Sequence, residues 1–556
     1  MHGKGLGSFC VGLLSTLAVA ACTLHQAPLQ REIRGAATPV NQTDGMYRIT
    51  EGQYRNTIAD IFGPDIIAGG RFEPTSRRPH GLLAPGDYQI AVSPSGMEQF
   101  AAMARTIASQ VVDEKHRAVL IGCGPSSPKT VDNRCATQFF ARVGPLLFRR
   151  QLTKGDLQQY VSIAKSAGEA AGDFYAGLEL GLEAALVSPR FLFQIDEMEP
   201  IAGRPGEMQL DGYAKAVRLS FFLWNTSPDK ELLAAAGRGD LEHSKGLAKQ
   251  VDRLMASPRL TVGVRAFFSD MLQMDKLADL TKDSIVYPQF IPQVRNDMSE
   301  QLLRTLTALL LDERRDYREI FTTRRTFMTD ALGAVYAVPV PVKVGWFPYE
   351  FPPNSPRAGI LTEVNFLAAF SHNGRSSPTI RGQGIRELLL CQAVPDPPGN
   401  VDFTNFDASH AKTVRERLTE HRSNPACAGC HKITDPMGLA LENFDGIGMY
   451  RATENGSPID PSATIEGKEV TDPVGLGKAI SELPAATSCL VSRLTEYGTH
   501  RPPTDKAWLA DLNRQFAALG YRLPDLMRLI VTSDSFYARA KDQTLGKQPN
   551  GNPSKS

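Results

Sequence analysis

Apolar residues recur at helical spacing over most of this chain. After a capping box at residues 50–53, Tyr54, Ile58 and Ile61 fall on one helical face, and apolar residues again share one side of residues 173–187. The same pattern predicts further helices at residues 95–120, 213–224, 230–236, 247–256, 260–272, 292–311, 411–421, 485–498 and 505–536.

Alternation typical of strands is scarce. The main candidate is the Val-Pro-Val-Pro-Val run at residues 338–342, where the missing proline N–H groups restrict a strand to a sheet edge. Prolines and glycines are frequent over residues 348–399, which predicts loops on the surface. We therefore expect a mainly α, multi-helical fold.

Breaks in the helical pattern divide the chain into segments. We expect a signal peptide at 1–21, a polar tether at 22–45, an N-terminal helical domain at 46–120, a second helical domain at 121–200, a central helical domain at 205–345, a domain with a Cys-x-x-Cys-His (CxxCH) sequence at 355–455, a C-terminal helical domain at 470–540 and a disordered tail at 541–556.

The N-terminus has the pattern of an export signal. A short segment carrying Lys4 precedes an apolar run at 9–21, which is too short to span a bilayer comfortably. The run ends in Val-Ala-Ala-Cys, which resembles a bacterial lipobox with Cys22 as the lipidated residue; ordinary signal cleavage nearby is the alternative. Either interpretation predicts a bacterial protein exported to the periplasm or outer membrane, held at the membrane by lipid alone.

Composition adds little to this picture. The chain has 556 residues, 42% of them hydrophobic and 22% charged, with a formal net charge of +1. Its length predicts more than one domain, and its nearly neutral charge gives no indication of nucleic acid as a partner.

The sequence Cys-Ala-Gly-Cys-His at residues 427–431 carries the clearest chemistry. In CxxCH, Cys427 and Cys430 can form thioethers with the two vinyl groups of a haem, and His431 then binds the iron as the proximal ligand. A zinc site would need further Cys or His at ligand spacing, and a redox dithiol would need a thioredoxin-like βαβ setting. We find neither in the sequence and favour covalent haem c.

Export to an oxidising compartment would allow the remaining cysteines to form disulfides. Cys123 and Cys135 flank a turn-rich loop and are expected to form a disulfide. Cys391 and Cys489 are left by elimination, and either pair with each other or remain two separate buried thiols.

The residues around the motif carry a family resemblance. Residues 422–445, which include Ile-Thr-Asp-Pro-Met-Gly-Leu-Ala-Leu-Glu-Asn-Phe-Asp after CxxCH, resemble the planctomycete-type cytochrome c-like proteins. Matching pieces elsewhere are Tyr-Arg-Asn-Thr at 54–57, Phe-Arg-Arg at 148–150, Ser-Pro-Arg-Phe-Leu-Phe at 188–193, Leu-Ser-Phe-Phe-Leu-Trp at 219–224, Arg-Ala-Gly-Ile-Leu-Thr at 357–362 and Ser-Pro-Thr-Ile-Arg-Gly at 377–382. The resemblance covers about residues 46–540 and implies a large exported protein built from domains of unknown function around one CxxCH segment.

The sequence does not identify the second axial ligand of the haem. Met449 ranks ahead of Met437 and His500 as a distal ligand, and an open sixth position is the alternative. The resembling family usually has glycine where this chain has His500, so this histidine is either a ligand peculiar to this chain or an exposed turn residue. His372 and His421 are weaker candidates.

Charged residues near the motif have two interpretations each. Arg375, Arg381 and Arg386 either neutralise haem propionates or form a solvated face, which we favour. Asp435, Glu442 and Asp445 are expected to cap helices or pair with arginines rather than bind calcium, with Asp435-Pro436 as a helix start.

These features favour electron transfer by a lipid-anchored c-type haem protein, and they name no redox partner. The first alternative is a peroxidase- or oxidoreductase-like haem enzyme acting on an unidentified substrate. The second is a cell-surface binding or assembly protein in which CxxCH holds a structural haem or metal.

Overall fold

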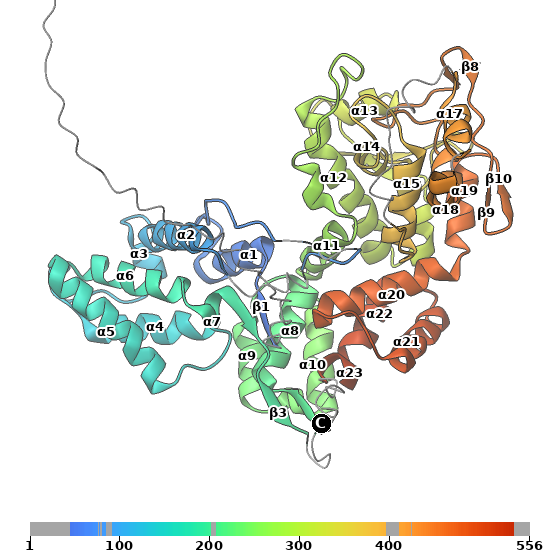
Figure 1. The fold of residues 1–556 in the computed structure, drawn as a ribbon. Coiled ribbons are helices and arrows are strands. Elements are labelled where there is room, and N and C mark those ends of the chain that lie inside the picture. The colour runs from blue at the N-terminus through green and yellow to red at the C-terminus, as the bar shows by residue number, and fades with distance from the viewer. Residues whose placement is uncertain are drawn as a thin grey trace, which may run out of the picture. The chain divides into compact units, whose positions relative to one another are not determined.

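Helices dominate the protein (Figure 1), as the sequence pattern predicts. The computed structural model describes residues 45–75, 77, 80–84, 92–201, 207–395, 411–423 and 425–538. The predicted signal peptide, the tether from Cys22 to residue 44 and the C-terminal tail lie outside these residues. The described residues, from Gly45 to Ala538, form one compact unit.

The N-terminal helices pack around a core of their own. They are α1 (Glu51–Phe62), α2 (Pro94–Val112), α3 (Arg117–Leu120), α4 (Asn133–Leu147), α5 (Lys154–Ala171), α6 (Phe174–Leu186) and α7 (Pro189–Leu192). Thr50 caps α1 in the predicted capping box. The helix expected over 95–120 is two helices, because Asp113 adopts an extended conformation after α2.

A second group of helices forms the start of the largest core. It comprises α8 (Gly212–Trp224), α9 (Lys230–Gly237), α10 (Ser244–Met255), α11 (Leu260–Met271) and the second half of α12 (Pro292–Thr307), with the short segments η1 (Asp240–Glu242), η3 (Ala308–Asp312) and η4 (Tyr317–Phe321). A smaller core holds α13 (Asp330–Tyr336), the first half of α12 and Leu277 of η2 (Met274–Leu277). Nearly every residue of α8 is buried. Its Val217 and Phe221 belong to the N-terminal core, whereas Leu219 and Phe222 belong to the largest core.

The C-terminal part adds further helices. They are η5 (Ile360–Thr362), α14 (Val364–Ala369), α15 (Pro378–Gly384), η6 (Ile385–Leu389), α17 (Val414–His421), α18 (Pro425–Leu439), α19 (Pro473–Ser481), α20 (Pro484–Thr499), α21 (Lys506–Ala518), α22 (Leu523–Val531) and α23 (Asp534–Tyr537). The loops predicted over residues 348–399 are present at 351–359 and 371–377, whereas largely buried helices occupy most of 360–389. The single helix expected over 505–536 is three, with a turn at Gly520 where φ is positive.

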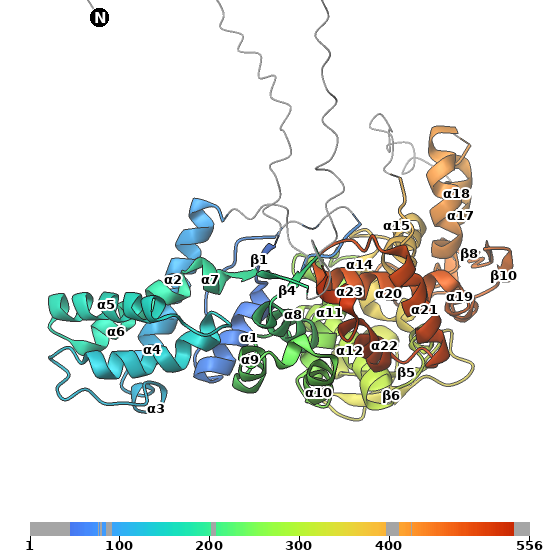
Figure 2. The same ribbon diagram turned by 90° about the horizontal axis from the view of Figure 1, so that it is seen from below.

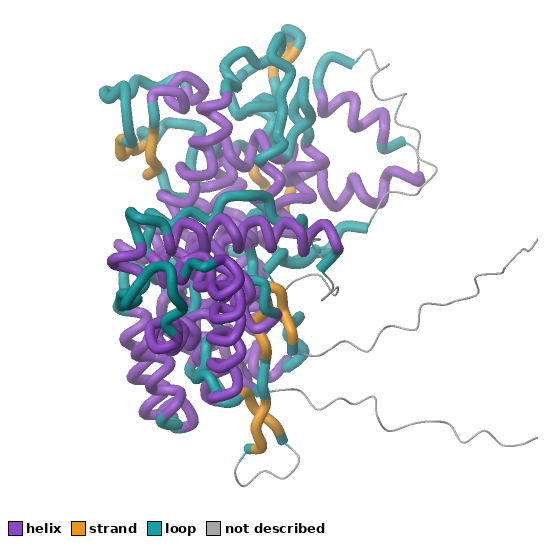
Figure 3. Tube along the Cα trace, turned by 90° about the vertical axis from the view of Figure 1, so that its left-hand side faces the viewer, coloured by secondary structure: helices purple, strands orange, loops and turns teal. Residues whose placement is uncertain are grey.

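The strands of the described residues form two-stranded antiparallel pairs, drawn in orange among the purple helices of Figure 3. They are β1 (Met46–Arg48) with β2 (Phe193–Ile195), β3 (Met198–Pro200) with β4 (Met208–Leu210), β5 (Arg325–Met328) with β6 (Phe347–Glu350), β7 (Thr453–Glu454) with β8 (Ser457–Pro458), and β9 (Ala463–Ile465) with β10 (Lys468–Val470). The strand expected at 338–342 is wrong: two prolines there lack ladder donors, and the pairing falls to β5 and β6 on either side.

Both expected disulfides are present. Cys123 bonds to Cys135 with a Cα–Cα distance of 5.6 Å, and Cys391 bonds to Cys489 with a Cα–Cα distance of 5.2 Å. The alternative of two separate thiols at Cys391 and Cys489 is therefore wrong. The second bridge ties the end of η6 to α20, so it links segments 98 residues apart.

Helices α15 and α18 approach closely, and this contact shapes the region around CxxCH. A Cβ on Gly382 of α15 would overlap the Thr434 carbonyl, and a Cβ on Gly438 of α18 would overlap the Pro378 carbonyl. Glycine at both positions lets the two backbones meet. Helix α17 covers α18 through a small cluster of Val414, Leu418 and Leu439, and Figure 2 shows the two helices together.

Candidate haem-binding site

The CxxCH motif lies in the first turns of α18, which begins at Pro425. Proline is well suited to the first turn of a helix because its missing N–H has no partner there. Cys427 is buried and Cys430 is half-buried; both are free thiols, unlike the other cysteines that the structure describes. The Cys430 Sγ lies 3.6 Å from the Pro395 carbonyl oxygen. Helical spacing places both thiols and His431 on adjoining positions of one face.

His431 is held by a buried carboxylate one turn further along α18. Its Nδ1 lies 3.0 Å from both carboxylate oxygens of Asp435, whose side chain is fully buried. The Thr379 hydroxyl of α15 donates to Asp435 Oδ1 at 2.9 Å. Because the carboxylate accepts hydrogen bonds, this geometry places the imidazole proton on Nδ1 and leaves the Nε2 lone pair available to a metal.

A cavity of about 310 Å³ opens beside His431. Its lining mixes apolar and polar side chains, namely His372, Arg375, Ser376, Ser377, Pro378, Thr379, Ile380, Val414, Leu418, His421 and His431. The rings of His421 and His431 meet edge to face with centroids 4.9 Å apart. Burial, and then the neighbouring His431, lower the pKa of His421, which favours its neutral form near pH 7.

The three higher-ranked distal candidates do not line this cavity. Met437 is fully buried in the largest core, and Met449 packs against the core around α13 and α14. His500 ends α20 in a left-handed conformation and stacks on Tyr47 with ring centroids 4.5 Å apart. His500 is therefore a buried residue and no exposed turn histidine. The structure instead brings His372 and His421, the weaker candidates, to the cavity of His431.

The predicted arginine face is wrong for two of its three members. Arg381 is fully buried, and its guanidinium donates to the carbonyls of Leu441 at 3.1 Å and Phe444 at 2.7 Å. Burial lowers the pKa of Arg381 to about 10, so it remains charged near pH 7. Arg386 donates to the Ile433 carbonyl at 2.6 Å. Both arginines therefore fasten the backbone after CxxCH, and Arg375 alone of the three lines the cavity.

The three acidic residues have three different roles. Asp435 lies inside α18, so the expected helix start at Asp435-Pro436 is wrong; α18 continues through Pro436. Glu442 pairs with Arg451 at 2.9 Å and with Arg381 at 3.6 Å, which confirms the expected pairing with arginine. Asp445 Oδ1 accepts from the N–H groups of residues 447 and 449 and so closes a turn.

Sequence reasoning missed the contact between Asp435 and His431. The signal was their spacing of four residues, which brings the two side chains together once the segment is helical. Expecting a helix to start at Asp435 concealed that signal. Thr379 gave no comparable signal, because only the crossing of α15 and α18 brings it to Asp435.

These residues fit a covalently attached haem. Two free thiols at CxxCH spacing, an imidazole oriented through Nδ1 and an adjacent cavity are the donor set that such a haem requires. In the described part of the chain, no group of three or more His, Cys, Asp and Glu side chains is arranged to hold a metal ion.

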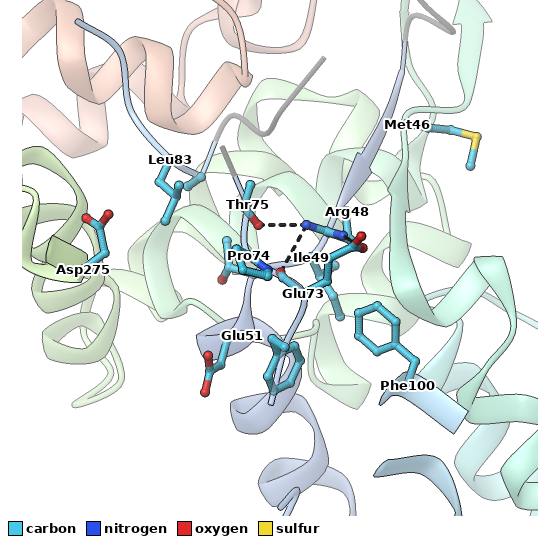
Figure 4. A pocket seen from close by; sticks show the side chains of 13 residues that line it. Met46, Arg48, Ile49, Glu51, Glu73, Pro74, Thr75, Leu83, Phe100 and Asp275 are labelled. Atoms are coloured by element: carbon cyan, nitrogen blue, oxygen red, sulfur yellow. Dashed lines mark hydrogen bonds and ion pairs between the residues drawn. The ribbon is translucent and has the colours of Figure 1, made fainter. Parts of the chain in front are cut away.

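A second cavity, of about 320 Å³, lies in the N-terminal half near β1 (Figure 4). Arg48 bonds Glu73 at 2.6 Å and Thr75 at 3.0 Å within its wall. None of the CxxCH residues line this cavity, and Arg48 and Glu73 in its wall form an ion pair with each other.

Comparison with family models identifies five domains in order along the chain, all described as proteins of unknown function. They are DUF1587 at residues 47–113, DUF1595 at 135–196, DUF1592 at 210–338, DUF1588 at 357–454 and DUF1585 at 466–536. Together they are the domain set of the planctomycete cytochrome c-like multidomain proteins. The DUF1588 match contains CxxCH, Asp435 and the cavity.

Two other comparisons gave no relatives: neither the curated proteins nor the solved structures include a match. Within the described ranges, no helix combines the length and apolar character that a membrane crossing requires.

Proposed function

We propose that this chain is an exported, lipid-anchored c-type haem protein that transfers electrons at the periplasmic or outer surface of a bacterial cell. The observation that carries the proposal is the state of the cysteines. Four pair in disulfides, while Cys427 and Cys430 stay free on one face of α18 beside His431.

The residues of α18 would hold the haem in different ways. The thiols of Cys427 and Cys430 would each add across a vinyl double bond: one S–H bond and one C=C π bond would break, one S–C bond and one C–H bond would form, and no oxidant would be consumed. His431 offers Nε2 to the iron, and Asp435 holds the ring in position. A bound haem supplies one-electron exchange at iron.

Export rests on other features. Two disulfides are typical of proteins that fold in an oxidising compartment. The apolar run at 9–21 followed by Cys22 supports a lipid anchor and a periplasmic or outer-membrane location, although these residues lie outside the described part.

A pyridine haemochrome spectrum tests covalent attachment. The full chain, exported together with cytochrome c maturation proteins, should retain haem c after denaturation and acid–acetone extraction. A Cys427→Ala/Cys430→Ala variant should lose it, whereas a Cys123→Ala/Cys135→Ala variant should retain it because those thiols are distant in the fold. An absence of covalent haem, or equal haem in the first variant, contradicts the proposal.

A haem enzyme is the second candidate, and the cavity favours it. About 310 Å³ lies beside His431, and neither Met437, Met449 nor His500 reaches it. If neither His372 nor His421, which line the cavity, binds the iron, its sixth position is exchangeable and suits peroxide or another small ligand. This candidate predicts a high-spin spectrum and turnover of peroxide with an organic donor. A low-spin, six-coordinate haem without turnover favours electron transfer.

A further inference from the structure

We infer that Asp435 is a positioning residue that fixes the tautomer of His431 and strengthens it as an electron donor to iron. The inference rests on the proposed function, since it concerns the same site. It goes further by predicting where the haem lies on the redox scale.

The contact is built into one helix. Residues 431 and 435 are one turn apart in α18, and His431 Nδ1 lies 3.0 Å from each Asp435 oxygen. The His431 side chain is 14% exposed and the Asp435 side chain is fully buried, so the carboxylate is shielded from water. A charge-assisted hydrogen bond is stronger in such a low-dielectric setting.

Asp435 interacts with two histidines, with His431 through the hydrogen bond and with His421 electrostatically. Among the described residues, no lysine or arginine lies within ion-pair distance of its carboxylate. Its other donors are the hydroxyls of Thr379, at 2.9 Å, and Thr434, at 3.4 Å. Burying a carboxylate without a lysine or arginine partner is costly. The hydrogen bond from the His431 N–H offsets part of that cost, so we expect this bond to be strong.

The crossing of α15 and α18 brings Thr379 close to Asp435. Gly382 and Gly438 let the two helices meet, and Thr379 at the start of α15 then reaches Asp435 Oδ1. The hydroxyl proton shares the carboxylate with His431, and the hydroxyl oxygen, 3.3 Å from His431 Nδ1, competes with the carboxylate as an acceptor for the imidazole N–H. Thr379 therefore moderates the pull that Asp435 exerts on the imidazole.

This arrangement has a definite electronic consequence. Hydrogen bonding of Nδ1–H to a carboxylate raises the basicity of a metal-binding imidazole. A more basic axial ligand stabilises the ferric state over the ferrous state and lowers the reduction potential. We therefore expect a haem of low potential, poised to donate electrons.

The test compares three variants of the haem-loaded full chain. Asp435→Asn keeps the shape but removes the charge, so the reduction potential should rise. Thr379→Val removes the donor that competes for Asp435, so the potential should fall. Asp445→Asn is the control: it removes one charge from the same segment, and its amide oxygen still accepts from residues 447 and 449, so the potential should stay near wild type. Spectroelectrochemical titration measures all four proteins.

The outcomes separate this inference from the proposed function. Wild-type protein without covalent haem defeats the proposed function. Haem-loaded wild type with equal potentials in Asp435→Asn and Asp445→Asn overturns the inference alone, as does a rise in Thr379→Val.

A second measurement needs no haem and covers the case in which Asp435→Asn fails to fold. Nitrogen-15 NMR of the full-length Cys427→Ala/Cys430→Ala protein should show His431 protonated at Nδ1 and unprotonated at Nε2. The Nε2–H tautomer would overturn the inference.

Discussion

Glu363 is a buried carboxyl group that forms no ion pair within the described residues. It accepts hydrogen bonds from the hydroxyls of Thr305 at 3.0 Å and Thr326 at 2.9 Å, and so joins α12 to β5. Burial raises its pKa from 4.5 to about 7. Desolvation outweighs the two hydrogen bonds, and the neutral form is favoured below that pH.

This shift predicts a pH-dependent stability. A carboxyl group with a raised folded pKa stabilises the fold fully below its unfolded value of 4.5, and the contribution is lost as pH rises through about 7. The loss amounts to about 3 kcal/mol once the group is ionised. Glu363→Gln should therefore unfold at higher denaturant concentration than wild type at pH 8, with little difference at pH 4.5.

Urea unfolding at both pH values measures the effect. Glu98→Gln, an exposed glutamate on α2, is the control and should follow wild type. Equal pH dependence of wild type and Glu363→Gln would show that Glu363 titrates normally.

Residue roles could be predicted from sequence where a motif fixes local geometry. His431 is identified by CxxCH alone. Arg381 is the opposite case, because its burial depends on how residues 441–445 fold back over α15. A charge in a sequence of mixed polarity looks solvated until tertiary structure encloses it.

At the scale of elements, the crossing of α15 and α18 is the contact on which the site depends. It brings Thr379 to Asp435 and lets Arg386 reach the Ile433 carbonyl. Both helices have glycine where they meet, and any side chain there would force them apart.

Gly438→Ala should therefore destabilise the protein. The added methyl group overlaps the Pro378 carbonyl, and overpacking of this kind costs about 1–3 kcal/mol or more. Gly429→Ala is the matched control in the same helix. Nothing lies within 4 Å of its added Cβ, and replacing a helical glycine stabilises by about 1 kcal/mol. Thermal unfolding should give opposite shifts, and a stable Gly438→Ala would show that the helices can separate at little cost.

Elements with a clear apolar face were predicted well. Residues 174–186 and 212–224 form α6 and α8 close to the expected bounds. Pairing between distant strands was not predictable, since β1 joins β2 across almost 150 residues and neither strand alternates over more than three positions. Local periodicity carries no information about such partners.

At the scale of the whole molecule, the two disulfides differ in the length of the loop that each closes. Cys123–Cys135 closes a loop of 12 residues within the N-terminal part, and Cys391–Cys489 closes one of 98 residues between the CxxCH segment and the C-terminal helices. Loop-closure entropy grows with the logarithm of loop length.

Removing the longer bridge should cost more. In the chain-entropy estimate, loss of the Cys391–Cys489 bridge destabilises by nearly 5 kcal/mol and loss of the Cys123–Cys135 bridge by about 3 kcal/mol. Paired Cys→Ala variants, compared by denaturant unfolding, measure the difference. The opposite order would mean that native-state strain outweighs the entropy term.

The largest core joins segments that lie far apart along the chain. Five family models match in succession, yet the largest core draws residues from Leu82 to Tyr537. Shared burial between distant segments leaves no pattern in either segment alone, so only the structure reveals it.

Helix α8 gives this sharing an evolutionary consequence. It supplies Val217 and Phe221 to one core and Leu219 and Phe222 to another. A lineage that lost a neighbouring segment would leave part of α8 exposed to water, and one that acquired the CxxCH segment alone would receive helices without their apolar partners. Selection should therefore transmit these segments as a block, and a gene carrying only some of them should show compensating substitutions along α8.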